Sequence, residues 1–139
     1  MSEYSAELYV HAIAIEREAA RRYAELAQAM AAQGNHAVAE LFRVLGCVEQ
    51  RHLDELKRRT AGQPLPLLDA DYTWHGEVPE TVTLALAQAL WAEKRARAFF
   101  EHAARMARDA ETLALAREMA AEEAEHLGAI ERMRARAAG

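Results

Sequence analysis

Two short motifs contain the residue types in this chain that are best suited to chemistry. Glu49 precedes His52 by three residues, and Glu123 precedes His126 by the same spacing. At about 100° per residue, this spacing puts both side chains of a pair on one face of an α-helix, one turn apart. Both pairs lie within apolar stripes, where a carboxylate is costly to bury unless a positive charge lies beside it. Carboxylates and neutral imidazoles suit divalent first-row metals such as iron and manganese, so the motifs predict a metal centre.

Two further glutamates extend the pattern to four helices. Glu16 lies in an apolar stripe and is followed seven residues later by Tyr23, while Glu93 is followed seven residues later by Phe100. Glu18 is about 200° around the helix from Glu16 and is expected to face water. The repeated spacing predicts two helical hairpins related by a pseudo-two-fold axis.

The elements that position these residues are all expected to be helices. The 139-residue chain is rich in Ala, Leu, Glu and Arg and contains 6 Gly and 3 Pro, a composition that favours helix. Helical periodicity predicts helices over residues of about 5–32, 36–60, 80–107 and 112–137. The segment 61–79 contains the prolines and is expected to cross the whole bundle, because about 18 extended residues span up to about 60 Å. We therefore predict one domain over 1–139, an all-α four-helix bundle of two antiparallel hairpins joined by a long crossover.

The six candidate ligands are expected to lie at one level. Glu16 lies 18 residues before Gly34 in the first turn, and Glu49 and His52 lie 15 and 18 residues after it. At about 1.5 Å per residue these side chains are some 23–27 Å from that turn. In the second hairpin, Glu93, Glu123 and His126 likewise lie at similar distances from their turn. A crossover that reverses this hairpin would bring the ligands of both hairpins to the middle of the bundle.

Composition excludes several other classes of protein. The net charge of -5 argues against a nucleic-acid partner, and the single cysteine excludes an intramolecular disulfide framework. The sequence contains neither an apolar run long enough to span a membrane nor a signal peptide, so a soluble, cytoplasmic protein is expected.

Plainer interpretations apply to several individual residues. A single Glu-x-x-His pair is more often a solvated surface pair, and only the two pairs together favour a metal. Glu122 competes with Glu123 as a ligand but lies about 100° off the stripe. Cys47 is expected to be a buried or interface thiol, and Trp74 to pack over a bundle edge or a dimer interface. The remaining histidines are expected at the surface: His11, His36, His75 and His102.

These residues resemble the ferritin-like superfamily, and within it the rubrerythrin-type di-iron carboxylate proteins. The resemblance rests on Glu16 with Tyr23, on Glu93 and on the two Glu-x-x-His pairs, and it covers nearly the whole chain except the crossover. It implies that Glu49 and Glu123 bridge two iron ions, although manganese or a mixed pair is also possible. It further implies four terminal ligands: Glu16, Glu93, His52 and His126. Tyr23 would place its hydroxyl beside the metal site.

The resemblance implies an oxidoreductase that reduces peroxide or dioxygen, with a role under oxidative stress. Rubrerythrins usually carry a rubredoxin domain with paired Cys-x-x-Cys motifs, which this chain lacks, so electrons are expected from a separate rubredoxin-like donor. Leu90 and Ala96 stand where an extra glutamate would lie one turn from Glu93. The remaining set is closer to bacterioferritin-like sites, so a ferroxidase or iron-handling role without a ferritin cage is the alternative. A metal-free interaction bundle is the third interpretation, and a homodimer is expected in each case.

Overall fold

The computed structural model describes residues 1–138, and of Ala138 only the backbone. It contains four α-helices and, within these residues, no strand. The helices are α1 (Glu3–Ala32), α2 (His36–Thr60), α3 (Val82–Met106) and α4 (Ala110–Ala138). The predicted all-α four-helix bundle is confirmed, and each predicted helix end lies within two residues of the observed one.

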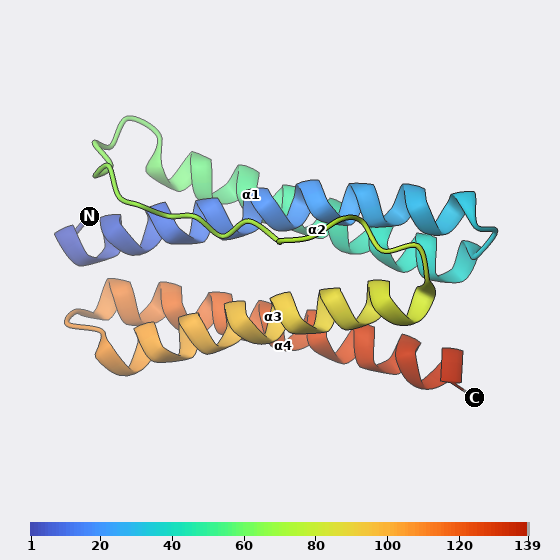
Figure 1. Ribbon diagram of the computed structural model, residues 1–139. Coiled ribbons are helices and arrows are strands. Elements are labelled where there is room, and N and C mark those ends of the chain that lie inside the picture. Colours follow the sequence, from blue (N-terminus) through green and yellow to red (C-terminus); the bar gives the residue numbers. More distant parts are fainter. Residues whose placement is uncertain (139) are drawn as a thin grey trace.

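The helices pair as two antiparallel hairpins, α1 with α2 and α3 with α4 (Figure 1). The first turn depends on Gly34, whose φ of +80° lies in the region that favours glycine, and on Asn35, whose side chain accepts the N–H of Val38. In the second turn, Asp109 Oδ1 accepts the N–H of Thr112 at 2.7 Å and caps the start of α4. Side-chain caps at both turns satisfy backbone N–H groups that the helices leave free.

The crossover runs along α1 from the end of α2 to the opposite end of the bundle, where α3 begins (Figure 1). Glu18 accepts the N–H of Trp74 at 3.1 Å, and Arg22 Nη2 donates to the carbonyl of Gly76 at 2.6 Å. The indole of Trp74 is buried and meets the Tyr23 ring edge-on at 5.2 Å. The expectation that Glu18 faces water is therefore wrong, because the crossover covers that side of α1.

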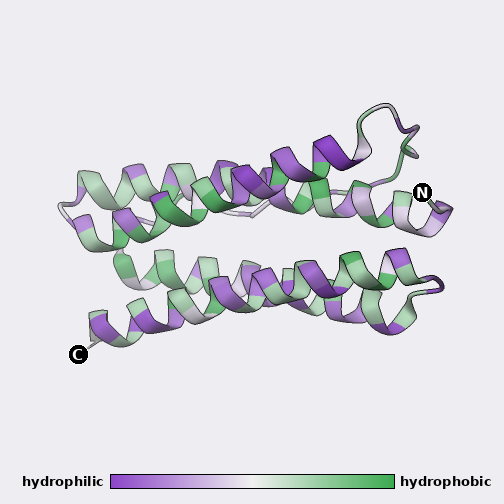
Figure 2. Cartoon of the chain, turned by 180° about the vertical axis from the view of Figure 1, so that it is seen from behind, coloured by the Kyte–Doolittle hydropathy of each residue, from purple (hydrophilic) through white to green (hydrophobic). Residues whose placement is uncertain are grey.

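Hydrophilic and hydrophobic residues alternate along each helix, as expected for amphipathic helices around a shared core (Figure 2). The core consists of two apolar clusters at different heights. One cluster includes Tyr23, Leu26, Phe42, Leu86 and Ile130, and the other includes Leu8, Leu56, Phe100, Leu115 and Met119. Each large buried side chain stabilises the fold by about 1.5–3 kcal/mol.

A charged layer lies where the chain passes from one apolar cluster to the other. On α1, Ala12 belongs to one cluster and Ala19 to the other, with Glu16 between them. On α4, Glu123 lies in the same way between Met119 and Leu127. The fold thus places its buried carboxylates between two apolar clusters that exclude water from both sides.

Among residues 1–138, none of the helices is both long enough and apolar enough to span a membrane.

Candidate metal centre

Each helix contributes one buried glutamate to the middle of the bundle. Glu16 of α1 and Glu49 of α2 are 0% exposed, and Glu93 of α3 and Glu123 of α4 are 2% exposed. Each lies on its helix stripe because it is three or four residues from buried apolar neighbours. Burial of four carboxylates within a small bundle is energetically costly without a compensating positive charge.

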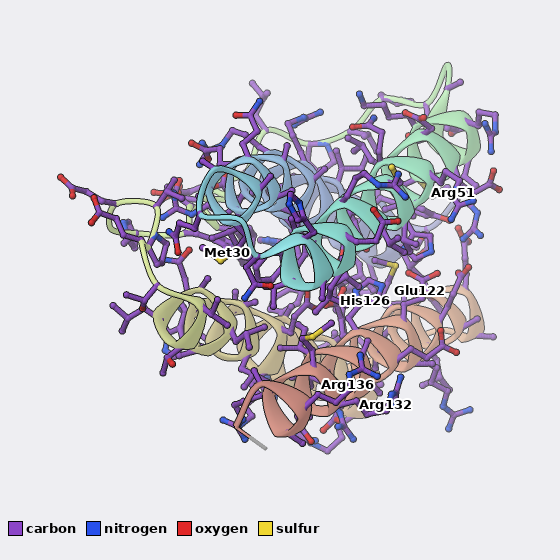
Figure 3. All side chains as sticks on the ribbon, turned by 90° about the vertical axis from the view of Figure 1, so that its right-hand side faces the viewer. Met30, Arg51, Glu122, His126, Arg132 and Arg136 are labelled. Atoms are coloured by element: carbon purple, nitrogen blue, oxygen red, sulfur yellow. The ribbon has the colours of Figure 1, made fainter. Side chains whose placement is uncertain are left out.

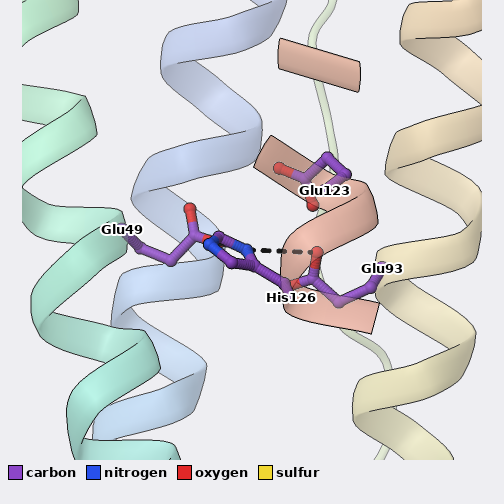
Figure 4. A group of neighbouring side chains, drawn as sticks. All are labelled: Glu49, Glu93, Glu123 and His126. Atoms are coloured by element: carbon purple, nitrogen blue, oxygen red, sulfur yellow. Dashed lines mark ion pairs between the residues drawn. The ribbon is translucent and has the colours of Figure 1, made fainter. Parts of the chain in front are cut away.

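One group of possible ligands joins three helices. Glu49, Glu93, Glu123 and His126 each offer an atom within 4.8 Å of the others, and all four residues are buried (Figure 4). Nδ1 of His126 lies 2.8 Å from Oε1 of Glu49 and 3.6 Å from Oε2 of Glu93. Three carboxylates and one imidazole at these distances form a compact donor set for a divalent cation.

A second group lies beside the first. It consists of Glu16, His52 and Glu122, which offer atoms within 4.8 Å of one another. Nδ1 of His52 is 3.0 Å from Oε2 of Glu122, and their side chains are 26% and 23% exposed. The rings of His52 and His126 stack at 6.1 Å with an interplanar angle of 11°, so the two groups are neighbours. The arrangement offers donors for two cations side by side.

The buried donor atoms fit metal ions because they lack other partners. Both carboxylate oxygens of Glu16 and of Glu49 are buried without a hydrogen-bond partner among residues 1–138, as are single oxygens of Glu93 and Glu123. The Nδ1 atoms of His52 and His126 and Oε2 of Glu122 are also buried without a hydrogen-bond partner among these residues. Buried polar atoms in native proteins are nearly always paired, so this concentration of unpaired acceptors in one layer indicates a cation site.

Protonation of the metal-free centre follows from burial and mutual repulsion. Burial raises the pKa of Glu49 to about 7 and, together with the charge of Glu93, raises the pKa of Glu123 well above its usual value. Burial also acts on Glu93, but Glu123, His126 and the Tyr23 hydroxyl outweigh it and lower the pKa of Glu93. Burial lowers the pKa of His126, yet the nearby Glu49 and Glu93 prevail and raise it to about 10. Protons therefore balance charge in this layer, and a bound cation must displace them.

Two comparisons with known proteins bear on this site. A family model described as rubrerythrin matches residues 7–65, which include Glu16, Glu49 and His52. The crystal structure of an uncharacterized conserved protein from Magnetospirillum magnetotacticum MS-1 is 38% identical, with a TM-score of 0.82 over 92% of this chain and 91% of that chain. The chain belongs to the rubrerythrin family. No curated protein matches it.

Tyr23 lies beside the candidate metal centre of this rubrerythrin-family protein. Its side chain is fully buried, and its Oη donates to Oε1 of Glu93 at 2.6 Å. Burial, followed by the charge of Glu93, raises the pKa of Tyr23 well above its ordinary value, so the phenol stays protonated at neutral pH. At the pseudo-symmetric position, Phe100 is equally buried without a hydroxyl. Only one of the two corresponding positions therefore carries a hydroxyl, and that hydroxyl bonds to Glu93.

The structure brings together all six predicted ligands of this rubrerythrin-family chain, four in the first donor group and two in the second, and it adds Glu122 as a seventh residue. Their roles as ligands remain predictions. Glu122 was set aside from the sequence because it lies off the helix stripe, although its spacing of four residues before His126 is a signal that allows a shared face.

Two other expectations need correction. His11 is half-buried rather than on the surface, because the crossover covers it: its Nδ1 is 2.7 Å from the hydroxyl of Tyr72, and its ring lies 5.4 Å from that of Phe99. Cys47 is exposed in the single chain, so the expectation of a buried thiol is wrong, and the interface alternative remains a prediction. The remaining three histidines are exposed as expected: His36, His75 and His102.

Proposed function

We propose that this protein is a non-haem di-iron oxidoreductase that reduces peroxide or dioxygen with electrons from a separate donor. The observation that supports it best is the pair of adjacent donor groups with unpartnered atoms, buried between two apolar clusters. Reduction of hydrogen peroxide to two waters consumes two electrons and two protons. Two bound ferrous ions would supply those two electrons and act as Lewis acids toward the substrate oxygens.

The chain's own residues would hold the ions and keep the site dry. Following the family pattern, Glu49 and Glu123 would bridge the two ions. Glu93 and His126 would be the terminal ligands of one ion, and Glu16 and His52 those of the other. This assignment is supported by the two donor groups, each of which contains one of these pairs. Manganese or a mixed pair suits the same oxygen-rich and imidazole donors.

Tyr23 is positioned to hold a proton at its Oη beside the centre. The 2.6 Å hydrogen bond to Oε1 of Glu93 fixes the orientation of that carboxylate, and it leaves Oε2 directed at the shared donor group. Because the phenol is buried, its proton is retained at neutral pH. Tyr23 would therefore act as a positioning residue for Glu93.

A cavity of about 180 Å³ is lined by residues of α1, α3 and the crossover, and a small substrate would approach the centre through it. It is lined on one side by Ile15 and Ala92, which directly precede Glu16 and Glu93 in the sequence. Trp74 of the crossover also lines it. A volume of this size is sufficient for peroxide or dioxygen.

The test is consumption of oxidant by iron-loaded protein. Protein loaded with Fe(II) under anaerobic conditions is mixed with hydrogen peroxide or dioxygen, and the loss of oxidant is followed with the appearance of ferric absorption. We expect about one peroxide consumed per two irons, and sustained turnover when a reduced rubredoxin-like protein is added. Failure to consume either oxidant would overturn the proposal.

Iron handling is the second candidate function. It is favoured by Leu90 and Ala96, which stand one turn on either side of Glu93 where a further glutamate would otherwise be possible. This function predicts repeated oxidation of Fe(II) with more than two irons retained per chain. A stoichiometry fixed at two would remove it. Metal analysis of protein from its native source would also exclude a metal-free interaction bundle if iron or manganese is present.

A homodimer and a role in oxidative stress are part of the same proposal. Sedimentation of the purified full chain tests the dimer, and growth of a deletion strain under peroxide tests the role.

A further inference from the structure

The carboxylate of Glu122 is directed into the second donor group rather than into solvent. Its Oε2 is buried, has no hydrogen-bond partner within residues 1–138, and lies 3.0 Å from Nδ1 of His52. Figure 3 shows Glu122 near His126 in the space between α2 and α4. A glutamate on an exposed helix face would be expected to extend into water instead.

Arg59, the arginine whose charge acts on Glu122, is already paired with other carboxylates. Arg59 of α2 donates from Nη1 and Nη2 to Glu118 at 2.7 Å and from Nε to Glu55 at 3.2 Å. Among the described residues, the ion pair of Glu122 is the one with His52. Positive charge from a lysine or arginine therefore does not explain the inward position of Glu122.

The carboxylate of Glu122 lies beside Nδ1 of His52 rather than beside the other ring nitrogen. In both His52 and His126, Nδ1 is the buried nitrogen without a hydrogen-bond partner among residues 1–138. Nδ1 of His126 faces Glu49 and Glu93 of the first donor group, and the two rings are nearly parallel. Nδ1 of His52 therefore corresponds to Nδ1 of His126. A carboxylate that only oriented His52 would bond the nitrogen remote from the metal, whereas Glu122 lies at Nδ1, which corresponds to the nitrogen that His126 directs at the first donor group.

Glu122 is the second carboxylate of its donor group, beside Glu16 and the imidazole of His52. Apart from the two carboxylates assigned as bridges, each end of the centre would otherwise have one carboxylate and one imidazole. Both oxygens of Glu16 are buried and unpartnered within the described chain, which independently indicates a cation at this end.

We infer that Glu122 is a metal ligand at the Glu16–His52 end of the centre. This inference rests on the proposed metal-binding function. It gives the ion at that end a second terminal carboxylate, supplied by the fourth helix. The added negative charge favours the more highly charged state of that ion, so Glu122 also lowers its reduction potential.

The test compares the full-length protein with Glu122→Gln and with Glu125→Gln as matched control. Glu125 is exposed on the same helix and lies outside both donor groups. Each protein is titrated with Co(II), and the visible absorption of the bound ion is recorded. We expect two ions per chain for the wild type and for Glu125→Gln. Glu122→Gln is expected to bind one of the two ions at least about tenfold more weakly, with an altered spectrum of that ion.

A weaker affinity alone does not distinguish a ligand from a carboxylate that only orients His52, because loss of the latter also changes affinity by about 10–100-fold. A crystal structure of the cobalt-loaded wild type distinguishes the two. This experiment needs no variant, so it can be done even if Glu122→Gln fails to fold. We expect a Glu122 oxygen at about 2.0–2.2 Å from one ion, as carboxylates bind zinc.

Three results would overturn the inference. Two bound ions with both Glu122 oxygens beyond bonding distance, or an unchanged titration and spectrum for Glu122→Gln, would refute it while leaving the metal centre intact. A wild-type protein that binds no cobalt, manganese or iron would overturn the proposed function together with it.

Discussion

Tyr23 of α1 donates a 2.6 Å hydrogen bond to Oε1 of Glu93 on α3, and so links the two hairpins at the level of the charged layer. The hydroxyl satisfies one oxygen of Glu93 and leaves Oε2 3.6 Å from Nδ1 of His126. The crossover holds this tyrosine in place, because Trp74 packs on its ring. A single hydroxyl therefore connects the crossover, the core and the candidate metal centre.

Replacement of Tyr23 by Phe is expected to lower the free energy of unfolding of the metal-free protein by about 1.5–3 kcal/mol, because a buried carboxylate loses its hydrogen-bond donor. Urea denaturation measures the change. Tyr4→Phe is the matched control: Tyr4 is 43% exposed on the same helix, and its loss of a hydroxyl should change stability by less than about 0.5 kcal/mol. Equal stability of Tyr23→Phe and wild type would show that the hydrogen bond to Glu93 contributes nothing.

The double substitution Glu49→Gln and Glu123→Gln is expected to abolish binding of the two ions while the chain still folds. It removes the two carboxylates assigned to bridge the ions and replaces them with neutral side chains of similar volume. Because it also removes buried charge, the metal-free variant should be as stable as the metal-free wild type at pH 8, or more stable. Metal analysis and urea denaturation check the two parts. A variant that still binds two ions per chain would contradict the assignment.

Stability of the metal-free protein is expected to fall as pH rises from about 5 to about 8. Burial raises the pKa of Glu49, and also that of Glu122, to about 7, so the folded state binds protons more tightly than the unfolded chain in this range. Glu49 alone would account for a loss of about 3 kcal/mol at 1.36 kcal/mol per pKa unit. The lowered pKa of His52, caused by burial, acts in the opposite direction below about 6.5 and offsets part of the loss.

The raised pKa of His126, about 10, should continue this decline above pH 7 as the ring loses its proton. Urea denaturation of chelator-treated protein at pH 5, 6.5 and 8 measures the trend. The Glu49→Gln variant should show a flatter dependence. Metal-loaded protein should show the reverse trend, because metal ions compete with protons for the same atoms. Rising stability of the metal-free protein over pH 5–8 would refute the described protonation.

Trp74→Ala is expected to destabilise the fold by about 3–5 kcal/mol, because it leaves a cavity between the crossover and α1. The side chain is 8% exposed, whereas Trp91 of α3 is 49% exposed and serves as the control. Trp91→Ala should cost less than about 1 kcal/mol. Thermal and urea denaturation compare the two. Since Trp74 contacts Tyr23, its loss should also weaken metal binding, and equal effects of the two substitutions would show that the crossover contributes little to the fold.

Much of the candidate site follows from periodicity and counting. Glu16 and Glu93 were predicted to face inward because a helix repeats every 3.6 residues, and an apolar stripe fixes which side is buried. The matched heights of Glu49 and Glu123 followed from the constant rise of a helix and from a crossover long enough to reverse the second hairpin. These features are local or nearly local, so one sequence contains the information for them.

The errors come from residues whose surroundings are supplied by distant parts of the chain. Glu18 and His11 were expected at the surface because the helix alone leaves them there, yet the crossover lies along α1 and covers both. An irregular segment has no periodicity to show which face it follows. Its path depends on where Trp74 and its neighbours find contacts in the folded bundle.

The sequence by itself determined four amphipathic helices, two reversed hairpins and six inward candidate ligands, since helix geometry relates residue spacing directly to position. Only the tertiary structure showed that Glu122 lies beside them. In a bundle, each helix contacts more than one neighbour, so its buried sector is wider than a single stripe. Glu122 lies at the edge of the α4 stripe, and the position of α2 beside it turns that edge into a site facing His52.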